Sequence, residues 1–310
     1  MNQIEIPERK IKLEVPAHWD EMTAVQARYC LKQAVLAASG IIDPEEARVR
    51  CLYYLLDIER DSESVRKELL LTKRQREEKF SRIALLCEEL ITFLFADNGK
   101  GQLEINYTPV LNHFPQVKAG KVVLYGPSHL LADLTFGELR AAVEEMQAYF
   151  DSRGEDQLSR MIACLYRPER KDWESWQRAE NYDGRRREPF NRARIEDLAL
   201  ITARLGKVER TGILLWFSHS LQYIQSEDLM ISGREINLSP LFPQPVQEDS
   251  EPLRPDQRGA GWTGVLFQLA EQKVFGEVDK ADRTGFFDIL VYMYEKHLEN
   301  QKAKAKQKKK

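Results

Sequence analysis

The chain of 310 residues carries 46 basic and 49 acidic side chains, a formal net charge of −3, and an apolar content of 43%. This apolar content can form a sizeable core, which excludes wholesale disorder, and the length predicts one large or two smaller domains. The near balance of charge excludes a protein that binds nucleic acid over its whole surface, because counterion release requires a basic face.

Residues 1–130 are predicted to form an N-terminal helical region with a small β element. Alternating apolar and polar residues over 1–16 indicate one or two strands. The capping-box sequence Thr23-Ala24-Val25-Gln26 begins a first helix, and Pro44 stands in the first turn of a second. A spacing of three to four residues between apolar side chains from Phe80 to Leu94 predicts another amphipathic helix.

Two further stretches of the N-terminal region are rich in β-forming residues. These are 103–107 and 121–125, with proline, asparagine and glycine between them. We expect them to form a small hairpin that pairs with the N-terminal strands, because an isolated hairpin is only marginally stable.

Residues 131–238 are predicted to form a second helical region. It opens on another capping box, Thr135-Phe136-Gly137-Glu138, and its second helix must end before Pro168. Two more helices are expected over 195–205 and 212–225. The second of these is nearly all apolar, which predicts a central helix with buried residues Leu214, Trp216, Phe217 and Leu221.

The remainder of the chain is predicted to consist of three segments. Residues 239–261 hold five prolines and form a loop or linker, 262–300 form a C-terminal helix pair, and 301–310 form a disordered lysine-rich tail. Together these patterns predict a mainly α protein, with one or more multi-helix, bundle-like domains and a small antiparallel β element.

The sequence shows no pattern that indicates catalysis, a cofactor or a metal. Gly259-Ala260-Gly261-Trp262-Thr263-Gly264 matches GxGxxG, but the preceding segment contains two prolines and cannot be the central strand that a dinucleotide site requires. The histidines lack zinc-site spacing; they are His18, His113, His129, His219 and His297. We therefore expect a non-enzymatic protein with no catalytic, cofactor-binding or metal-binding residues.

The cysteines and the first residues of the chain indicate the cellular compartment in which we expect the protein. Cys30, Cys51, Cys87 and Cys164 lie in apolar helical contexts without a CxxC pair, which predicts buried, reduced thiols. The first fifteen residues are charged and lack the apolar segment of a secretory signal. No run of about 18 apolar residues occurs, so we expect a cytoplasmic protein without a membrane-spanning helix.

The segment from Arg167 to Arg194 combines nine basic with six acidic residues and interleaves aromatic side chains. Arginine beside tryptophan and tyrosine is typical of protein-binding hot spots, and it also suits base stacking with phosphate contact. A surface connection whose aromatic rings cap the core fits the pattern as well. The candidate partner-binding residues are Arg170, Trp173, Trp176, Arg178, Tyr182, Arg185, Arg186 and Arg187.

Several strings in the chain together carry a family resemblance. They are Val15-Pro16-Ala17-His18-Trp19-Asp20-Glu21-Met22-Thr23, Tyr125-Gly126-Pro127, Leu134-Thr135-Phe136-Gly137-Glu138, Ala163-Cys164-Leu165-Tyr166-Arg167-Pro168, and the stretch from Trp262 to Phe275-Gly276. In their pattern and order, over most of residues 11–300, the chain resembles uncharacterised proteins that tailed phages and prophages encode among their tail genes. It looks like a tail-assembly-chaperone-like protein.

The resemblance implies a chaperone-like interaction factor that acts in phage tail assembly in the host cell cytoplasm. Its partners would be phage tail proteins, with the tape-measure protein as a candidate. One alternative is a structural virion component, a tail or connector subunit. Another is a nucleic-acid-binding module that uses the Arg/aromatic segment and the lysine tail, although the interspersed acidic residues argue against a track of phosphate contacts.

Overall fold

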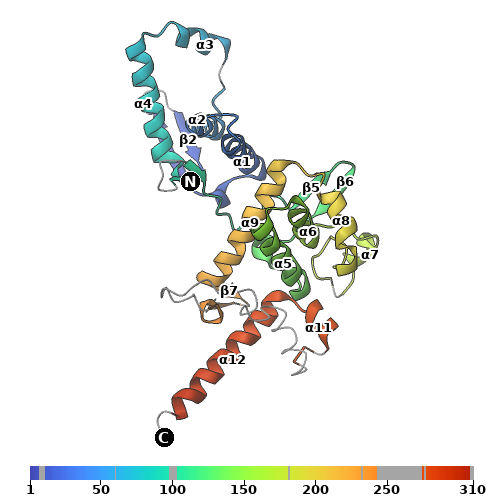
Figure 1. Ribbon diagram of the computed structural model, residues 1–310. Coiled ribbons are helices and arrows are strands. Elements are labelled where there is room, and N and C mark those ends of the chain that lie inside the picture. The colour runs from blue at the N-terminus through green and yellow to red at the C-terminus, as the bar shows by residue number, and fades with distance from the viewer. Residues whose placement is uncertain are drawn as a thin grey trace. The chain divides into compact units, whose positions relative to one another are not determined.

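The computed structural model describes residues 1–6, 11–59, 61–97, 103–180, 182–231, 233–242, 274–275 and 277–307 (Figure 1). Helices predominate, and the strands form small two-stranded antiparallel sheets, so the predicted fold class is confirmed. The chain divides into two compact units. Unit 1 comprises Met1–Phe114 and Lys207–Trp216, and unit 2 comprises Pro115–Gly206 and Phe217–Lys310.

Unit 1 opens with a hairpin followed by two packed helices. Strands β1 (Asn2–Ile6) and β2 (Ile11–Val15) pair with each other, and α1 (Ala24–Ala38) packs against α2 (Pro44–Leu55). Both predicted helix starts are confirmed. The Thr23 hydroxyl accepts a hydrogen bond from the Gln26 amide at 3.2 Å, and the Asp43 carboxylate accepts one from the Glu45 amide at 2.9 Å.

The rest of unit 1 is a pair of helices, a short hairpin and the first half of a long helix. The elements are η2 (Trp19–Glu21), α3 (Ser62–Leu69), α4 (Lys73–Leu90), η3 (Thr92–Leu94), β3 (Phe95–Asp97), β4 (Leu103–Ile105) and the start of α9 (Lys207–Ser226). In the last of these, Trp216 is fully buried and its indole Nε1 donates to the Val110 carbonyl at 3.2 Å. The predicted burial of Leu214, Trp216, Phe217 and Leu221 is confirmed.

Unit 2 contains the remaining elements. They are β5 (Gln116–Ala119), β6 (Val122–Tyr125), η4 (His129–Leu131), α5 (Phe136–Ser152), α6 (Glu155–Leu165), α7 (Trp173–Trp176), η5 (Arg192–Arg194), α8 (Ile195–Thr202), β7 (Asp228–Ile231), β8 (Arg234–Asn237), η6 (Ser239–Leu241), α11 (Val278–Arg283) and α12 (Phe286–Gln307). Helix α5 packs against α6 and α11, and α6 packs against α8. Buried apolar side chains on these faces form the core of the unit, among them Leu139, Ile162, Leu165 and Leu198.

The predicted strand pairing was wrong. Residues 103–107 and 121–125 do not pair with each other or with the N-terminal strands, because each stretch finds a partner nearer in the chain: β4 pairs with β3, and β6 pairs with β5. The N-terminal strands pair only with each other among the described residues.

The predicted segments and the units of the structure have different bounds. The units divide between Phe114 and Pro115, where the prediction had residue 130, and Lys207–Trp216 belongs to unit 1 although it was predicted within the second region. Helix α12 continues through Gln307, where a disordered tail was expected from residue 301. Residues 243–273, which include most of the predicted linker and the expected helix before residue 273, lie outside the described residues. None of the described helices has both the length and the apolar character needed to cross a membrane.

Candidate functional site

The Arg/aromatic segment forms a loop of unit 2 that is closed at its base by backbone hydrogen bonds. The chain leaves α6 and pairs with β6, since the amides of Tyr125 and Arg167 donate to each other's carbonyls at 2.8 and 3.2 Å. Residues 168–170 then face residues 186–188, with the Arg170 amide donating to the Arg186 carbonyl at 3.0 Å. We call residues 169–187 the Arg–aromatic loop; helix α7 lies within it.

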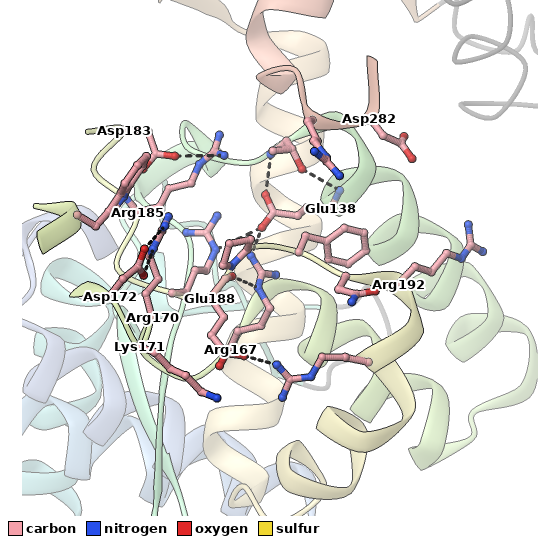
Figure 2. A pocket seen from close by; sticks show the side chains of 18 of the residues that line it. Glu138, Arg167, Arg170, Lys171, Asp172, Asp183, Arg185, Glu188, Arg192 and Asp282 are labelled. Atoms are coloured by element: carbon pink, nitrogen blue, oxygen red, sulfur yellow. Dashed lines mark hydrogen bonds and ion pairs between the residues drawn. The ribbon is translucent and has the colours of Figure 1, made fainter. Parts of the chain in front are cut away.

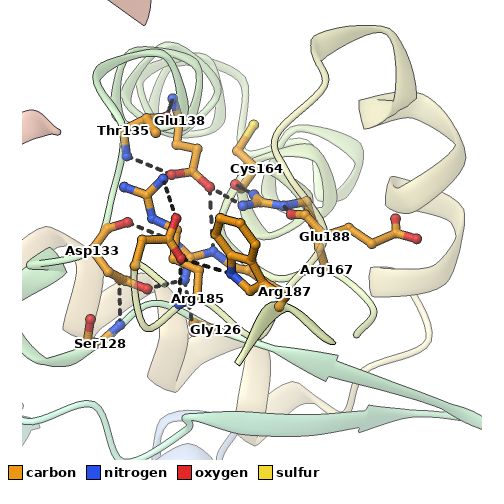
Figure 3. A network of polar contacts seen from close by, with 12 residues as sticks. Gly126, Ser128, Asp133, Thr135, Glu138, Cys164, Arg167, Arg185, Arg187 and Glu188 are labelled. Atoms are coloured by element: carbon orange, nitrogen blue, oxygen red, sulfur yellow. Dashed lines mark hydrogen bonds and ion pairs between the residues drawn. The ribbon is translucent and has the colours of Figure 1, made fainter. Parts of the chain in front are cut away.

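A buried ionic network lies beneath the base of this loop (Figure 3). Glu138, on the first turn of α5, is 1% exposed, and Arg167 and Arg187 are each 2% exposed. The Glu138 carboxylate accepts from Arg167 Nη2, lies 3.5 Å from Arg187 Nε, and accepts from the Thr135 amide at 2.7 Å. One carboxylate therefore joins the helix start to both sides of the loop base.

The two guanidinium groups make further contacts inside the protein. Arg167 donates to the Glu188 carbonyl at 2.7 Å and to the Cys164 carbonyl. Arg187 donates to the Asp133 carboxylate and, at 3.2 Å, to the Asp133 carbonyl. These contacts satisfy buried charges that would otherwise strongly destabilise the fold.

Electrostatics within the network keep Glu138 ionised. Burial by itself raises the pKa of this carboxyl, but the positive charges of Arg167 and Arg187 and the Thr135 amide lower it to about 2. The network is therefore fully charged at neutral pH, and it fixes the loop base by charge-assisted hydrogen bonds.

The outer part of the Arg–aromatic loop is a cluster of aromatic rings and guanidinium groups. The Tyr182 ring packs edge-on against Trp173 and Trp176, with centroids 5.9 and 6.5 Å apart. The Arg170 guanidinium lies 4.0 Å from the Trp176 ring centroid, and that of Arg186 lies 5.3 Å from Trp173. Such stacking places planar, positively charged groups against the aromatic rings.

Carboxylates of the same loop orient these arginines. Arg170 forms a forked pair with Asp172, at 3.0 and 2.9 Å, and Arg186 donates to Glu169 at 2.5 Å. Tyr182 is 41% exposed, and both tryptophans are half-buried. The three rings are thus only partly buried, and a part of each ring is accessible to solvent.

Most of the predicted partner-binding residues lie in one cluster in the structure. One of them, Arg187, is buried and is therefore not available to a partner. Arg187 is not a surface residue, because its guanidinium is committed to Asp133 and Glu138 beneath the loop. Arg185 is partly buried beside Asp183, while Arg178 is exposed. Arg170 precedes the four-residue helix α7, and it reaches Trp176 from outside that helix.

A hollow of about 950 Å³ adjoins the Arg–aromatic loop within unit 2 (Figure 2). Its walls come from the start of α5, from residues 167–194 and from α11. Eight basic and six acidic side chains line it, and Trp176, Pro189 and Phe190 add apolar surface. Figure 2 shows Arg170, Lys171 and Asp172 on one side of the hollow and Arg192 and Asp282 on the other.

Sequence reasoning missed the two acidic residues of the buried network. It assigned Glu138 only to a capping box, a role that the side chain does fill through one carboxylate oxygen, while the other oxygen binds Arg167. Asp133 was not singled out, and no local sequence signal marks its pairing with Arg187.

The cysteines are free and buried, as predicted. Burial raises the pKa of Cys164 to about 12 and that of Cys87 to about 11. Within the described part of the chain, no three histidine, cysteine or acidic side chains are grouped so as to hold a metal ion. The GxGxxG string at 259–264 lies outside the described residues.

The groups gathered at this site are suited to non-covalent recognition. The stacked guanidinium groups and aromatic rings offer contact area, and the buried network holds the base of the loop in place. The chain matches no family model, and no curated protein or solved structure is significantly similar to it.

Proposed function

We propose that the protein is a non-enzymatic interaction factor that binds a partner protein through the Arg–aromatic loop, and that it acts as a chaperone-like factor in phage tail assembly. The observation that carries the first part is the cluster of Trp173, Trp176 and Tyr182 with Arg170 and Arg186 stacked against it. Tryptophan, tyrosine and arginine are the residue types most enriched among binding hot spots.

The way the loop is fixed also favours binding. Association requires surface groups to lose conformational freedom, and a loop that is already ordered loses less. The base of the Arg–aromatic loop is held by backbone pairing and by the buried charges of Glu138, Arg167 and Arg187. The rings are packed edge-on against one another before any partner arrives, so less of the interaction free energy is spent on ordering them.

The second part of the proposal, a role in tail assembly, is supported by the family resemblance in the order of its sequence strings. In this proposed role the protein acts in the host cell cytoplasm. Its partners are phage tail proteins, and the tape-measure protein is the first candidate. Six acidic residues lie within 167–194 and would repel phosphates, which favours a protein partner over nucleic acid.

Affinity capture from phage-producing cells tests this role. The tagged full-length protein is expressed during phage production, and captured proteins are identified by mass spectrometry. We expect tail components to be enriched over a tag-only control. Recovery of none, with the protein well expressed and folded, would contradict the proposal, and a stoichiometric amount of the protein in purified particles would favour a virion component instead.

A further inference from the structure

We infer that the hollow beside the Arg–aromatic loop binds an acidic segment of the partner protein through its carboxylates. This inference rests on the proposed function, because it specifies the chemistry of the partner at the same site.

Basic side chains outnumber acidic ones in the lining, and most of the acidic ones are already used. Asp172, Asp183 and Glu188 pair with Arg170, Arg185 and Arg194 of the lining itself. Asp282 pairs with Arg140 at 3.0 Å, and Glu138 is consumed by the buried network. Asp279 alone among the six lining carboxylates forms no ion pair within the described residues.

Among the described residues, two basic side chains of the lining form no ion pair. They are Lys171, in the Arg–aromatic loop, and Arg283, in α11. A third, Arg192, pairs only with Glu144, at 2.8 Å, and both side chains of that pair are more than half exposed. Exposed pairs contribute little, so an incoming carboxylate can replace Glu144 at small cost.

The form of the site favours carboxylates over a nucleic-acid backbone. A nucleic-acid strand requires a continuous basic track, and the ion-paired carboxylates that lie among the basic residues of the lining interrupt such a track. A hollow of about 950 Å³ is instead a discrete site, of the size that encloses a short segment or a ligand. Arginine forks bind carboxylates bidentately, and Trp176 supplies apolar contact beside them.

A binding assay with a defined probe tests the inference. Fluorescein-labelled octaglutamate is titrated with the full-length protein at about 20 mM salt, where screening is weak, and binding is followed by fluorescence anisotropy. The test variant is Lys171→Glu with Arg283→Glu. The matched control is Lys121→Glu with Arg234→Glu, which reverses the same two residue types at exposed positions of unit 2 that do not line the hollow.

We expect octaglutamate to bind the wild-type protein, and we expect affinity to fall at least about tenfold in the test variant but less than about threefold in the control. Absence of wild-type binding, or equal losses in the two variants, would overturn the inference. So would tighter binding of a single-stranded oligonucleotide of equal charge that the test variant also abolishes, because the hollow would then be a phosphate site.

The outcome is separable from that of the proposed function. If the variant Lys171→Glu with Arg283→Glu still captures tail proteins, the proposed function stands, and the inference that the hollow binds an acidic segment is refuted. Binding of octaglutamate that depends on these two residues, without capture of any tail protein, would support the site and contradict the assembly role.

Discussion

Replacing Glu138 with glutamine would remove the negative charge that Arg167 and Arg187 share, while keeping the size of the side chain and an oxygen for the Thr135 amide. Both guanidinium groups are 2% exposed and would stay buried with only Asp133 to balance them. Removing one partner of a buried ion pair typically costs about 3–5 kcal/mol, because the remaining charge is left uncompensated.

The pKa of Glu138 gives a second route to the same magnitude. The folded protein lowers this pKa from 4.5 to about 2, and at about 1.4 kcal/mol per pKa unit this corresponds to about 3 kcal/mol of stability. Because the folded-state pKa is the lower one, this contribution is complete above about pH 4.5 and is lost as the pH falls toward 2.

Urea denaturation followed by circular dichroism measures the effect. We expect Glu138→Gln to lower the free energy of unfolding by about 3 kcal/mol at pH 7, and we expect the gap to the wild type to narrow below about pH 4.5. The control is Glu144→Gln, which removes an exposed partner of Arg192 and should cost less than about 1 kcal/mol. A gap below about 1 kcal/mol for Glu138→Gln, or one that stays constant down to pH 3, would refute the reasoning.

Two further predictions concern the core. Trp216→Ala should lower the free energy of unfolding by about 3–5 kcal/mol, because it removes a fully buried ring and the donor to the Val110 carbonyl; a loss below about 1 kcal/mol in urea denaturation would place the ring at the surface. Cys87 and Cys164 should not react with a thiol reagent at pH 8 in the folded protein but should react after denaturation, since burial raises both pKa values; fast labelling without denaturant would contradict their burial.

Helix starts could be predicted because their signals are local. The capping boxes at Thr23 and Thr135 each involve residues only three positions apart, and both form as expected. The apolar run around Trp216 likewise predicted a buried helix, since an element that is apolar on all sides must be covered.

Strand pairing could not be predicted in the same way. The stretch at 103–107 has strong β character, but its partner β3 is only three residues long and follows directly on a helix. The apolar spacing that predicted a helix from Phe80 continues to Leu94, past the end of α4 at Leu90, and therefore hides the change to strand that begins at Phe95. A three-residue strand carries too little alternation to be recognised from sequence.

The candidate site was predicted only in part, because the sequence identified the loop but not the burial of its residues. Arginine and aromatic residues are conspicuous in composition, which identified the loop, but composition does not show which arginine is buried. Arg186 and Arg187 are neighbours of the same residue type, and only the fold distinguishes them. Arg187 pairs with Asp133 and Glu138 beneath the loop, whereas Arg186 pairs with Glu169 at the surface. Such long-range ionic partners leave no pattern in the local sequence.

The central claim, that the Arg–aromatic loop is an ordered binding surface, is tested most directly by Trp173→Ala combined with Trp176→Ala, measured for thermal stability and for partner capture together. Both rings are half-buried, and each packs edge-on against Tyr182 within the loop. Phe150→Ala, which removes an exposed ring at the end of α5, is the matched control. We expect the double variant to keep a melting temperature close to that of the wild type and to lose partner capture, while the control keeps both. A stable double variant that captures the same proteins as the wild type would contradict the claim, and so would one that unfolds, because the tryptophans would then belong to the core.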